Sequence, residues 1–274
     1  AEPVMHLPPA RGGRAIEFRN VGFHYPAKDG AEPRWVLREI SFVVRAGATL
    51  GIVGATGSGK SALMDLLPRL HDPQEGEILI DGIPITHIPL DELRAEMGVV
   101  PQESLLFSDT IDANLSYGTT DPEKGRAAAE IAQLTKTIEG FPGRFDTILG
   151  ERGINLSGGQ KQRAALARAL ARDPSIVILD DALSAVDTGT EADILRALGK
   201  SLAGRTTLIA SHRISAIRQA SWIVVLDEGR VVEVGRHEEL MAAGGRYRTL
   251  LRRQQLLESV EGDSLAEGAL ATTI

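Results

Sequence analysis

The feature that most limits the fold of this chain is the stretch Gly54-Ala55-Thr56-Gly57-Ser58-Gly59-Lys60-Ser61. It fits the pattern G-x-x-x-x-G-K-[ST] of a phosphate-binding loop, which lies between a buried strand and a helix. Both flanks agree with that context, because the apolar run at 48–53 precedes the stretch and SALMDLL follows it. Glycines let the backbone wrap around phosphates, and the amides at the start of a helix point toward them. We therefore favour a phosphate-binding loop over a plain glycine-rich turn.

Two adjacent carboxylates follow a second apolar run. Residues 176–179 read IVIL, and Asp180 and Asp181 come directly after them. In a phosphate-loop enzyme, the lysine of the loop reaches the β- and γ-phosphates, the serine binds Mg²⁺, and an acidic residue at the end of a neighbouring strand also holds the metal. The sequence therefore predicts a nucleoside triphosphate and Mg²⁺ as ligands, with Lys60 on the phosphates and with Ser61 and Asp180 on the metal. The alternative for Asp180 is an aspartate that only caps the next segment.

Composition excludes several classes of protein. The chain has 274 residues and 43% hydrophobic residues, enough for a large core. Its net charge of −7 argues against a nucleic-acid partner. The absence of cysteine excludes disulfides, cysteine-bound zinc and iron–sulfur clusters. No stretch approaches the ~20 apolar residues that cross a bilayer, and the proline- and glycine-rich start lacks the apolar core of a signal peptide. We interpret residues 1–13 as a linker.

The hydrophobic pattern predicts alternating strands and helices. Residues 15–25 and 35–44 are expected to form an antiparallel pair. Further strands are predicted at 48–54, 75–82, 176–179, 206–211, 222–228 and 230–235, and residues 90–102 are expected to form a short helix and then a strand. Helices are predicted at 61–70, 121–139, 157–172, 188–200, 213–219 and 237–259, with Asp121 and Ser157 as N-caps. Strands separated by helices indicate an α/β fold with a parallel sheet.

The motif Leu156-Ser157-Gly158-Gly159-Gln160 lies between the phosphate loop and the Asp180 strand. By itself it is an ordinary capped start of a helix. In this order, however, the chain resembles the ATP-binding-cassette (ABC) family, whose signature is LSGGQ, over about residues 14–255. The resemblance implies a P-loop NTPase (RecA-like) core with an antiparallel β subdomain and an α-helical signature subdomain. It places the ABC ATPase domain at 14–257, the helical subdomain at about 103–172, and a mobile tail at 258–274.

The resemblance also implies roles for single residues. Tyr25 matches the aromatic residue that stacks on adenine, and Gln102 matches the glutamine that touches Mg²⁺ and the attacking water and contacts the transmembrane partner. His212 matches the histidine that contacts the γ-phosphate. The plainer alternatives are a tyrosine packed on the sheet, a solvated loop glutamine and a structural histidine. The implied nucleotide contacts are Tyr25, the whole phosphate loop (Gly54, Ala55, Thr56, Gly57, Ser58, Gly59, Lys60 and Ser61), and Ser157, Gly158, Gly159 and Gln160.

In the family, two cassettes meet head to tail, with each ATP between the phosphate loop of one and the LSGGQ of the other. The resemblance therefore implies that Ser157, Gly158 and Gly159 serve the nucleotide of a second cassette. Residues 184–187 match the loop that crosses the dimer interface, although the family more often has leucine where Val186 stands. ATP then holds the pair together, and its hydrolysis loosens the pair.

Three classes of function share these motifs. A DNA-repair or chromosome-structure ATPase would carry long heptad segments, yet the 53 residues between Gln102 and Leu156 show none. Among transporters, the stretches at 16–26, 105–118 and 149–163 resemble exporters. The loop Gly150–Gly153 resembles the exporter loop that contacts the membrane domain. We expect an exporter motor at the cytoplasmic face of the inner membrane, with a membrane domain preceding the linker. An importer subunit and a mainly regulatory cassette are the alternatives.

Asp181 departs from the family, which has glutamate there to polarise the attacking water. Aspartate withdraws the carboxylate by roughly 1–1.5 Å, and a misplacement of about 1 Å can cost on the order of 10²-fold in rate. We expect Asp181, with His212 and Gln102, to form a slow catalytic site, and the chain to be one half of a heterodimeric exporter. The alternative is an Asp181 that still works, directly or through an extra water. The intact His212 slightly favours that alternative.

Overall fold

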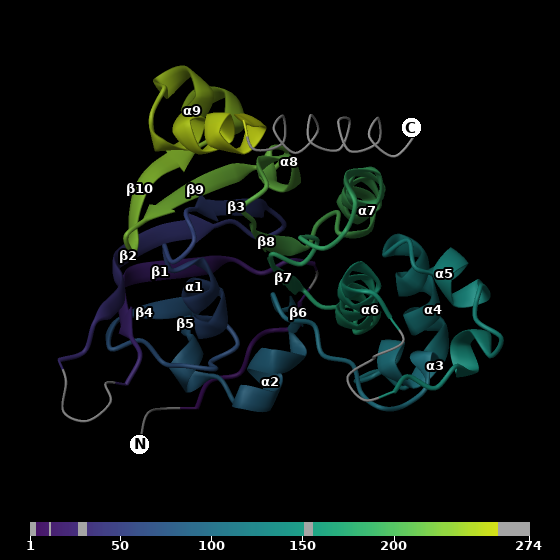
Figure 1. The fold of residues 1–274 in the computed structure, drawn as a ribbon. Helices are drawn as coiled ribbons and strands as arrows, with labels where there is room; N and C mark the ends of the chain where they lie inside the picture. The colour runs from purple at the N-terminus through teal and green to yellow at the C-terminus, as the bar shows by residue number, and fades with distance from the viewer. Residues whose placement is uncertain (1–3, 11, 27–31, 151–155, 257–274) are drawn as a thin grey trace, which may run out of the picture.

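Two β-sheets form the frame of the molecule (Figure 1). The structure is a computed structural model, and it describes residues 4–10, 12–26, 32–150 and 156–256. The first sheet is antiparallel and has the order β2 (Trp35–Val44), β1 (Ile16–His24), β4 (Glu75–Ile80), β5 (Ile83–Pro84). The expected antiparallel pair is confirmed, since Ile16 pairs with Val44 and Phe18 with Phe42.

The second sheet has six strands. Its order is β10 (Arg230–Gly235), β9 (Trp222–Asp227), β3 (Thr49–Gly54), β8 (Thr206–Ala210), β7 (Ile176–Asp180), β6 (Met97–Val100). Strand β10 is antiparallel to β9, and the remaining neighbours are parallel. The predicted parallel sheet is therefore confirmed. Because β3, β8 and β7 run the same way, their carboxyl ends meet at one edge.

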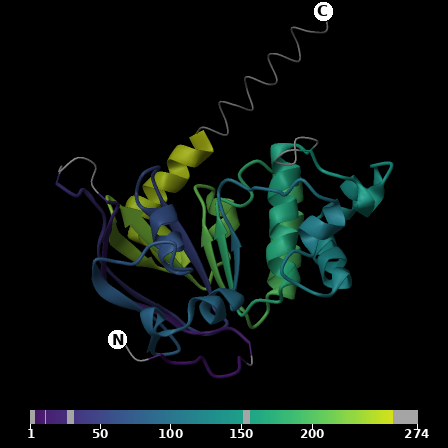
Figure 2. The same ribbon diagram turned by 90° about the horizontal axis from the view of Figure 1, so that it is seen from below.

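Helices cover both faces of the parallel sheet. They are α1 (Lys60–Leu66), α2 (Leu90–Ala95), α3 (Ile111–Leu115), α4 (Pro122–Ile131), α5 (Thr135–Glu139), α6 (Gly158–Ala171), α7 (Thr188–Ser201), α8 (Ile214–Ile217) and α9 (His237–Ala243), with short 3₁₀ turns at Ile85–His87 and Arg144–Asp146. Residues 246–256 are also helical. Figure 2 shows α6 standing beside the sheet, with α3, α4 and α5 on its outer side.

Strand β7 shows how the layers pack. All five of its residues are buried. Ile176 and Ile178 belong to a core that also contains α1 and the antiparallel sheet, whereas Val177 and Leu179 belong to a core built around α4 and α6. Side chains of a strand alternate between its faces, so a strand covered on both sides is apolar throughout. This explains the unbroken IVIL run.

Four predicted helices are shorter or broken in the structure, and the one predicted at 61–70 ends at Leu66. The helix predicted at 121–139 divides into α4 and α5 at Gln133, whose φ of 53° is left-handed, and the buried Leu134 turns back to donate to Ala129 O at 2.8 Å. The helix predicted at 237–259 breaks at Gly244, also left-handed at φ 72°. The helix predicted at 213–219 keeps only Ile214–Ile217. Asp121 and Ser157 are confirmed as N-caps.

The segment 4–10, within the predicted linker, lies against the domain. The backbone amide of Met5 donates to His87 O at 2.9 Å, and that of Leu7 donates to the Glu92 carboxylate at 2.6 Å. Residues 1–3 and 11 of the linker and the predicted tail at 258–274 lie outside the described residues. In the part of the chain that the structure describes, we find no helix with the length and apolarity to cross a bilayer.

Arg14 joins the two sheets. Its guanidinium, 2% exposed, binds Asp81, which follows β4, and Glu96, which precedes β6, each at 2.8 Å. It also donates to Pro8 O at 2.9 Å, so the N-terminal segment is held by the same side chain. The Arg14 hydrogen bond holds the pKa of Glu96 below its usual value, with burial opposing the shift. The Glu96 carboxylate therefore stays charged beside Arg14 at neutral pH.

We expect Arg14→Met to lower the free energy of unfolding by about 3 kcal/mol, because removing one partner of a buried ion pair leaves the other charges unpaired. Urea unfolding at pH 7 measures the change. Arg19→Met is the matched control, since Arg19 also bridges two carboxylates, Glu17 and Glu77, but is 49% exposed. Exposed pairs contribute about 1 kcal/mol or less. Equal losses in the two variants would contradict the assignment of Arg14 as the joint between the sheets.

Candidate functional site

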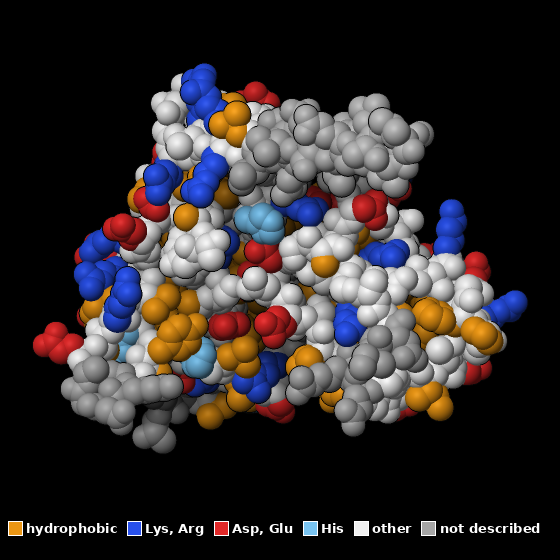
Figure 3. All heavy atoms as spheres, viewed as in Figure 1, with side chains coloured by type: hydrophobic (Ala, Val, Ile, Leu, Met, Phe, Trp, Pro, Cys, Tyr) orange, Lys and Arg blue, Asp and Glu red, His pale blue; other side chains and the backbone are white. Residues whose placement is uncertain are grey.

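A cavity of about 500 Å³ opens at the carboxyl ends of β3 and β7. Its lining includes Tyr25, Thr56, Gly57, Gly59, Lys60, Ser61, Gln102, Asp181 and His212, together with Val36, Ala62 and Ser184. The sequence predictions for these residues rested on separate motifs, and the fold brings them to one hollow. On the face shown in Figure 3, acidic, basic and apolar side chains are interspersed, and the coloured side chains form no broad surface of one charge.

The phosphate loop is shaped by its backbone. Strand β3 ends at Gly54 and α1 begins at Lys60. Gly59 has a left-handed φ of 102°, and a Cβ there would lie 2.7 Å from the Leu37 side chain, so only glycine fits. The Lys60 ammonium donates to the carbonyls of Gly54 at 2.9 Å and Ala55 at 3.1 Å. Burial lowers the pKa of Lys60, and the nearby Asp181 and Asp180 oppose that shift.

Asp180 ends β7 with a carboxylate that is 7% exposed. Burial raises the pKa of Asp180, and a hydrogen bond with the Ser61 side chain partly offsets the shift. The contact brings the two predicted metal ligands, one from β7 and one from α1, into touch. Mg²⁺ usually takes one or two carboxylates and completes its octahedron with water and phosphate oxygens, so this pair suits it. Within the described residues, no group of three or more Asp, Glu or His side chains is placed to hold a metal.

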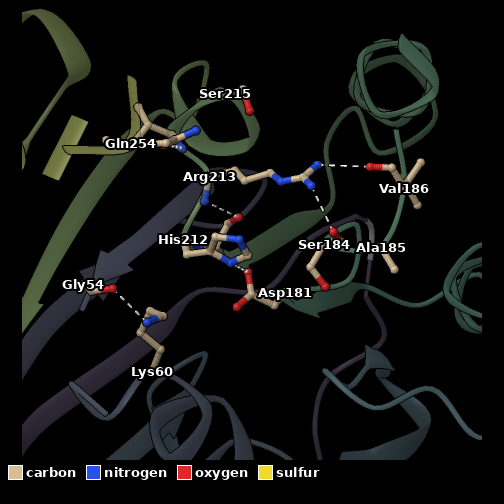
Figure 4. Close-up of polar contacts among 12 residues, drawn as sticks. Gly54, Lys60, Asp181, Ser184, Ala185, Val186, His212, Arg213, Ser215 and Gln254 are labelled. Carbon is tan, nitrogen blue, oxygen red and sulfur yellow. Dashed lines mark hydrogen bonds and ion pairs between the residues drawn. The ribbon is translucent and has the colours of Figure 1, made fainter. Parts of the chain in front are cut away.

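Asp181 points toward His212 (Figure 4). Its Oδ1 lies 2.9 Å from His212 Nδ1 and accepts from the backbone N–H of His212 at 3.2 Å. The residue is left-handed, with φ 46°, and its own N–H donates to Ala210 O at 2.9 Å. The Asp181 side chain is 14% exposed and that of His212 is 54% exposed. The Asp181 carboxylate is therefore held at the edge of the cavity by His212, which follows β8 and Ser211.

The predicted signature residues lie at the start of α6. Ser157 and Gln160 form a capping box, in which the Ser157 hydroxyl accepts from Gln160 N at 3.3 Å and Gln160 Oε1 accepts from Ser157 N at 2.9 Å. Ser157, Gly158, Gly159 and Gln160 are absent from the lining of the 500 Å³ cavity. Within one copy of the chain, the structure does not bring them to the phosphate loop.

Tyr25 reaches the cavity from the antiparallel sheet, and Gln102 reaches it from the end of β6, the edge strand of the parallel sheet. Tyr25, directly after β1, is 44% exposed and makes edge contacts with Phe23 and His71, with ring centroids 4.9 and 5.3 Å away. Gln102 follows β6 by two residues and is exposed. An exposed aromatic ring on a cavity wall is suited to stacking on a planar ligand.

Sequence reasoning assigned no role to two residues that hold the loop 181–187. Arg213 donates to Ser184 O at 3.0 Å and Val186 O at 3.1 Å (Figure 4). It is paired with the buried Glu191 at 2.5 Å. From α6, Gln162 also binds this loop. The sequence held one signal for Gln162, because it is a polar residue on the apolar helix face of Ala165, Leu166 and Ala169.

Comparison with known proteins decides the family. A model described as "ABC transporter" matches residues 37–184, just over half of the chain and the whole span from β2 to the loop after β7. The chain belongs to the ABC transporter family. The matched region contains the phosphate loop, the signature and both aspartates. The chain is an ATPase domain of that family, and the antiparallel and parallel sheets are those of its fold.

The relatives of the chain include a flippase and exporters. The chain is 47% identical over 248 residues to an ATP-dependent lipid A-core flippase of Alkalilimnicola ehrlichii, and the matched region covers 89% of this chain and 41% of the flippase. It is 46% identical over 256 residues to a β-(1→2)glucan export ATP-binding/permease protein of Rhodopseudomonas palustris, covering 93% and 42%. A solved bacterial Atm1-family ABC exporter with ATP bound superposes with a TM-score of 0.85 at 42% identity, covering 92% and 43%. The chain thus spans less than half the length of these relatives, and it is a nucleotide-binding domain of the exporter type.

We expect Asp180→Asn to raise the thermal unfolding midpoint near pH 8 by about 2–4 °C, which corresponds to about 1 kcal/mol in a domain of this size. Burial raises the pKa of Asp180 in the folded chain above its unfolded value. The folded state is therefore penalised wherever the carboxylate is charged, and the penalty disappears as pH falls through the raised pKa. The difference between variant and wild type should shrink toward pH 4.

Thermal scans from pH 8 to 4 without nucleotide or Mg²⁺ measure this difference. Asp193→Asn, a matched change at a 53% exposed carboxylate on α7, should shift the midpoint by less than about 1 °C. A wild type that is more stable than Asp180→Asn at pH 8 would show that the charged, buried carboxylate does not destabilise the folded state.

Proposed function

We propose that this chain is the ATP-hydrolysing motor of an exporter, working at the cytoplasmic face of a membrane with a second cassette. One observation carries the proposal: Lys60, Ser61, Gln102, Asp181 and His212 line a single cavity although they come from four places in the fold. A lysine and glycine loop at one end and a carboxylate with a histidine at the other match the two ends of a phosphoryl-transfer site.

Binding starts with the phosphate loop. Lys60 exchanges the carbonyls of Gly54 and Ala55 for the β- and γ-phosphates, and the loop amides surround them. The negative charge of the phosphates would offset the effect of burial, which lowers the pKa of Lys60, because a phosphate is a stronger partner for an ammonium than a carbonyl is. Tyr25 provides the surface on which the adenine stacks. The loop that provides these amides consists of Gly54, Ala55, Thr56, Gly57, Ser58, Gly59, Lys60 and Ser61.

Asp180, Ser61 and Gln102 would hold Mg²⁺. When bound, the ion neutralises charge that develops on the phosphate oxygens. The Ser61–Asp180 contact already places a hydroxyl beside a carboxylate that burial makes reluctant to stay charged. A cation beside Asp180 would lower its pKa and stabilise the charged form. Gln102 also lines the cavity, so its side chain can reach a metal or a water there.

Hydrolysis would use Asp181 and His212. Asp181 would accept a hydrogen bond from the attacking water and take its proton as the water oxygen bonds to the γ-phosphorus. The bond between the γ-phosphorus and the ADP oxygen breaks in the same step, which gives ADP and inorganic phosphate. His212 holds the carboxylate through Oδ1 and would contact the γ-phosphate. Because an aspartate is one methylene shorter than the glutamate usual in the family, its oxygens stop about 1–1.5 Å short of the water. We therefore propose that this site turns over slowly.

The signature residues support a second cassette. Ser157, Gly158, Gly159 and Gln160 do not line the cavity of their own chain, so they are available to a nucleotide held by another. We propose that the partner is a different half-transporter that carries the glutamate, which makes the assembly heterodimeric. The residues 184–187 would lie between the two cassettes. No nucleic acid takes part.

The surface beyond Gln102 suits a transmembrane partner. Leu105, Phe107 and Tyr117 are between 50% and 62% exposed, and the rings of Phe107 and Tyr117 lie 4.8 Å apart. Exposed aromatic clusters are typical of protein contact sites. Of the second predicted contact, the loop Gly150–Gly153, residues 151–153 lie outside the described residues. The relatives are named for lipid A-core flipping and for glucan export. Because these two substrates differ, we expect the membrane domain, and not this domain, to select the transported substrate.

We expect Lys60→Ala to weaken ATP binding by at least tenfold. A hydrogen bond to a charged group contributes about 1.5–3 kcal/mol, and 1.4 kcal/mol corresponds to a factor of ten in affinity. Titration with a fluorescent ATP analogue and Mg²⁺ measures the dissociation constant. Lys124→Ala removes the same charge on α4 and should leave the constant unchanged. Equal binding by wild type and Lys60→Ala would refute the nucleotide site.

We expect Asp181→Glu to increase ATP turnover by at least tenfold, since the longer side chain brings the carboxylate back to the water. Asp181→Ala should lower the remaining turnover further. Steady-state phosphate release measures both, and Asp193→Glu, the same change at an exposed position, is the control. A wild type that hydrolyses ATP rapidly, and gains nothing from glutamate, would exclude the slow site while leaving the ATPase itself intact. Binding without any turnover in all variants would favour a regulatory cassette.

A further inference from the structure

Gln162 is a buried amide on an otherwise apolar face of α6, and both the nitrogen and the oxygen of its side-chain amide form hydrogen bonds. The residue is 6% exposed. Its Nε2 donates to Ser184 Oγ at 2.9 Å and to Asp181 O at 3.3 Å, and its Oε1 accepts from Ala185 N at 2.9 Å. All three contacts fall on the loop 181–187. A buried amide is costly without partners, and here every partner belongs to one short loop.

The contact with Asp181 is to its backbone, which sets the direction of its side chain. Asp181 has a left-handed φ of 46°, a conformation that a non-glycine residue keeps only when its surroundings hold it. Its N–H donates to Ala210 O at 2.9 Å, and its carbonyl accepts from Ser184 N at 3.1 Å and from Gln162. The carboxylate that leaves this backbone reaches His212.

The first turn of α6 touches the same loop at a second point. A Cβ at Gly159 would lie 2.6 Å from Ala185 O, so the helix and the loop are in direct contact there. Gln162 follows Ser157 by about one and a half turns of the helix. A displacement of the start of α6 therefore displaces residues 181–187 as well, through backbone contact at Gly159 and through hydrogen bonds at Gln162.

Arg213 holds the other side of the loop. It reaches Ser184 O and Val186 O from the segment after β8, and the buried Glu191 fixes its guanidinium. Arg213 thus ties the loop to the parallel sheet, whereas Gln162 ties it to the helical layer. The loop lies between two anchors that belong to different layers of the domain.

We propose that Gln162 is a positioning residue that couples the signature helix α6 to the Asp181 carboxylate of the same chain. The inference rests on the proposed function, in which the start of α6 contacts the nucleotide of the second cassette and Asp181 acts on the nucleotide of its own. Contact with one nucleotide then adjusts the carboxylate that serves the other. Gln162 itself touches neither nucleotide.

The test measures single-turnover hydrolysis of ATP by the complete protein. We expect Gln162→Ala to lower the rate of the chemical step at least tenfold while the dissociation constant for ATP changes less than twofold. Gln162→Glu, as a carboxylate, keeps the acceptor for Ala185 N and loses the donor toward Asp181 O, so we expect a similar loss of rate. Gln219→Ala, the same change at an exposed glutamine, should leave the rate unchanged. A thermal midpoint recorded for each variant identifies any that fail to fold.

A double-mutant cycle separates positioning from a merely structural role. If Gln162 acts through Asp181, the double variant Gln162→Ala, Asp181→Ala should be no slower than Asp181→Ala alone. Effects that multiply would overturn the inference, as would a folded Gln162→Glu variant with the wild-type rate. A wild type that does not bind ATP would instead count against the proposed function. A rate of hydrolysis that Asp181→Ala leaves unchanged would do the same. The two failures are therefore distinguishable.

Discussion

The parallel pairing of β3, β8 and β7 is the constraint on which the rest of the site depends. Ile52 and Asp180 both pair with Ala210, so β7 and β8 end at one level and β3 ends two residues beyond it, at Gly54. The phosphate loop follows β3, the two aspartates lie at the end of β7, and His212 follows β8 at this same edge of the sheet. Because strands about 4.8 Å apart fix the spacing of whatever follows them, the backbone alone brings a lysine, two carboxylates and a histidine together.

This arrangement costs stability before any ligand binds. Asp180 is buried with a raised pKa, Lys60 is buried with a lowered one, and Asp181 keeps a left-handed backbone. Each of these features is unfavourable to the isolated fold and is useful to a site that receives phosphates and a metal ion. The large apolar cores on both faces of the sheet and the Arg14 cluster at its opposite end supply the compensating stability.

The adjacent aspartates have different surroundings and so different chemistry. Asp180 continues the strand, faces Ser61 and is almost fully buried. Asp181 lies beyond the strand, reverses the backbone and meets His212. The loop that begins at Asp181 is held by Arg213 on one side and Gln162 on the other. The same few residues thus belong to the nucleotide cavity and to the packing of the helical layer.

The sequence by itself determined the phosphate loop, the parallel sheet, the capped start of α6 and the strand end at Asp180. Each of these is a local pattern, such as Gly59-Lys60 before a helix or an apolar run buried on both faces, and local patterns do not depend on distant residues. Only the tertiary structure decided that the helix predicted at 121–139 breaks at Gln133, where burial of Leu134 outweighs helix propensity. It also decided that Gln162 and Arg213 hold the Asp181 loop, since their partners lie at least 19 and 27 positions away. Hydrogen bonds across such separations exist only once the layers have packed, so no pattern along the chain reveals them.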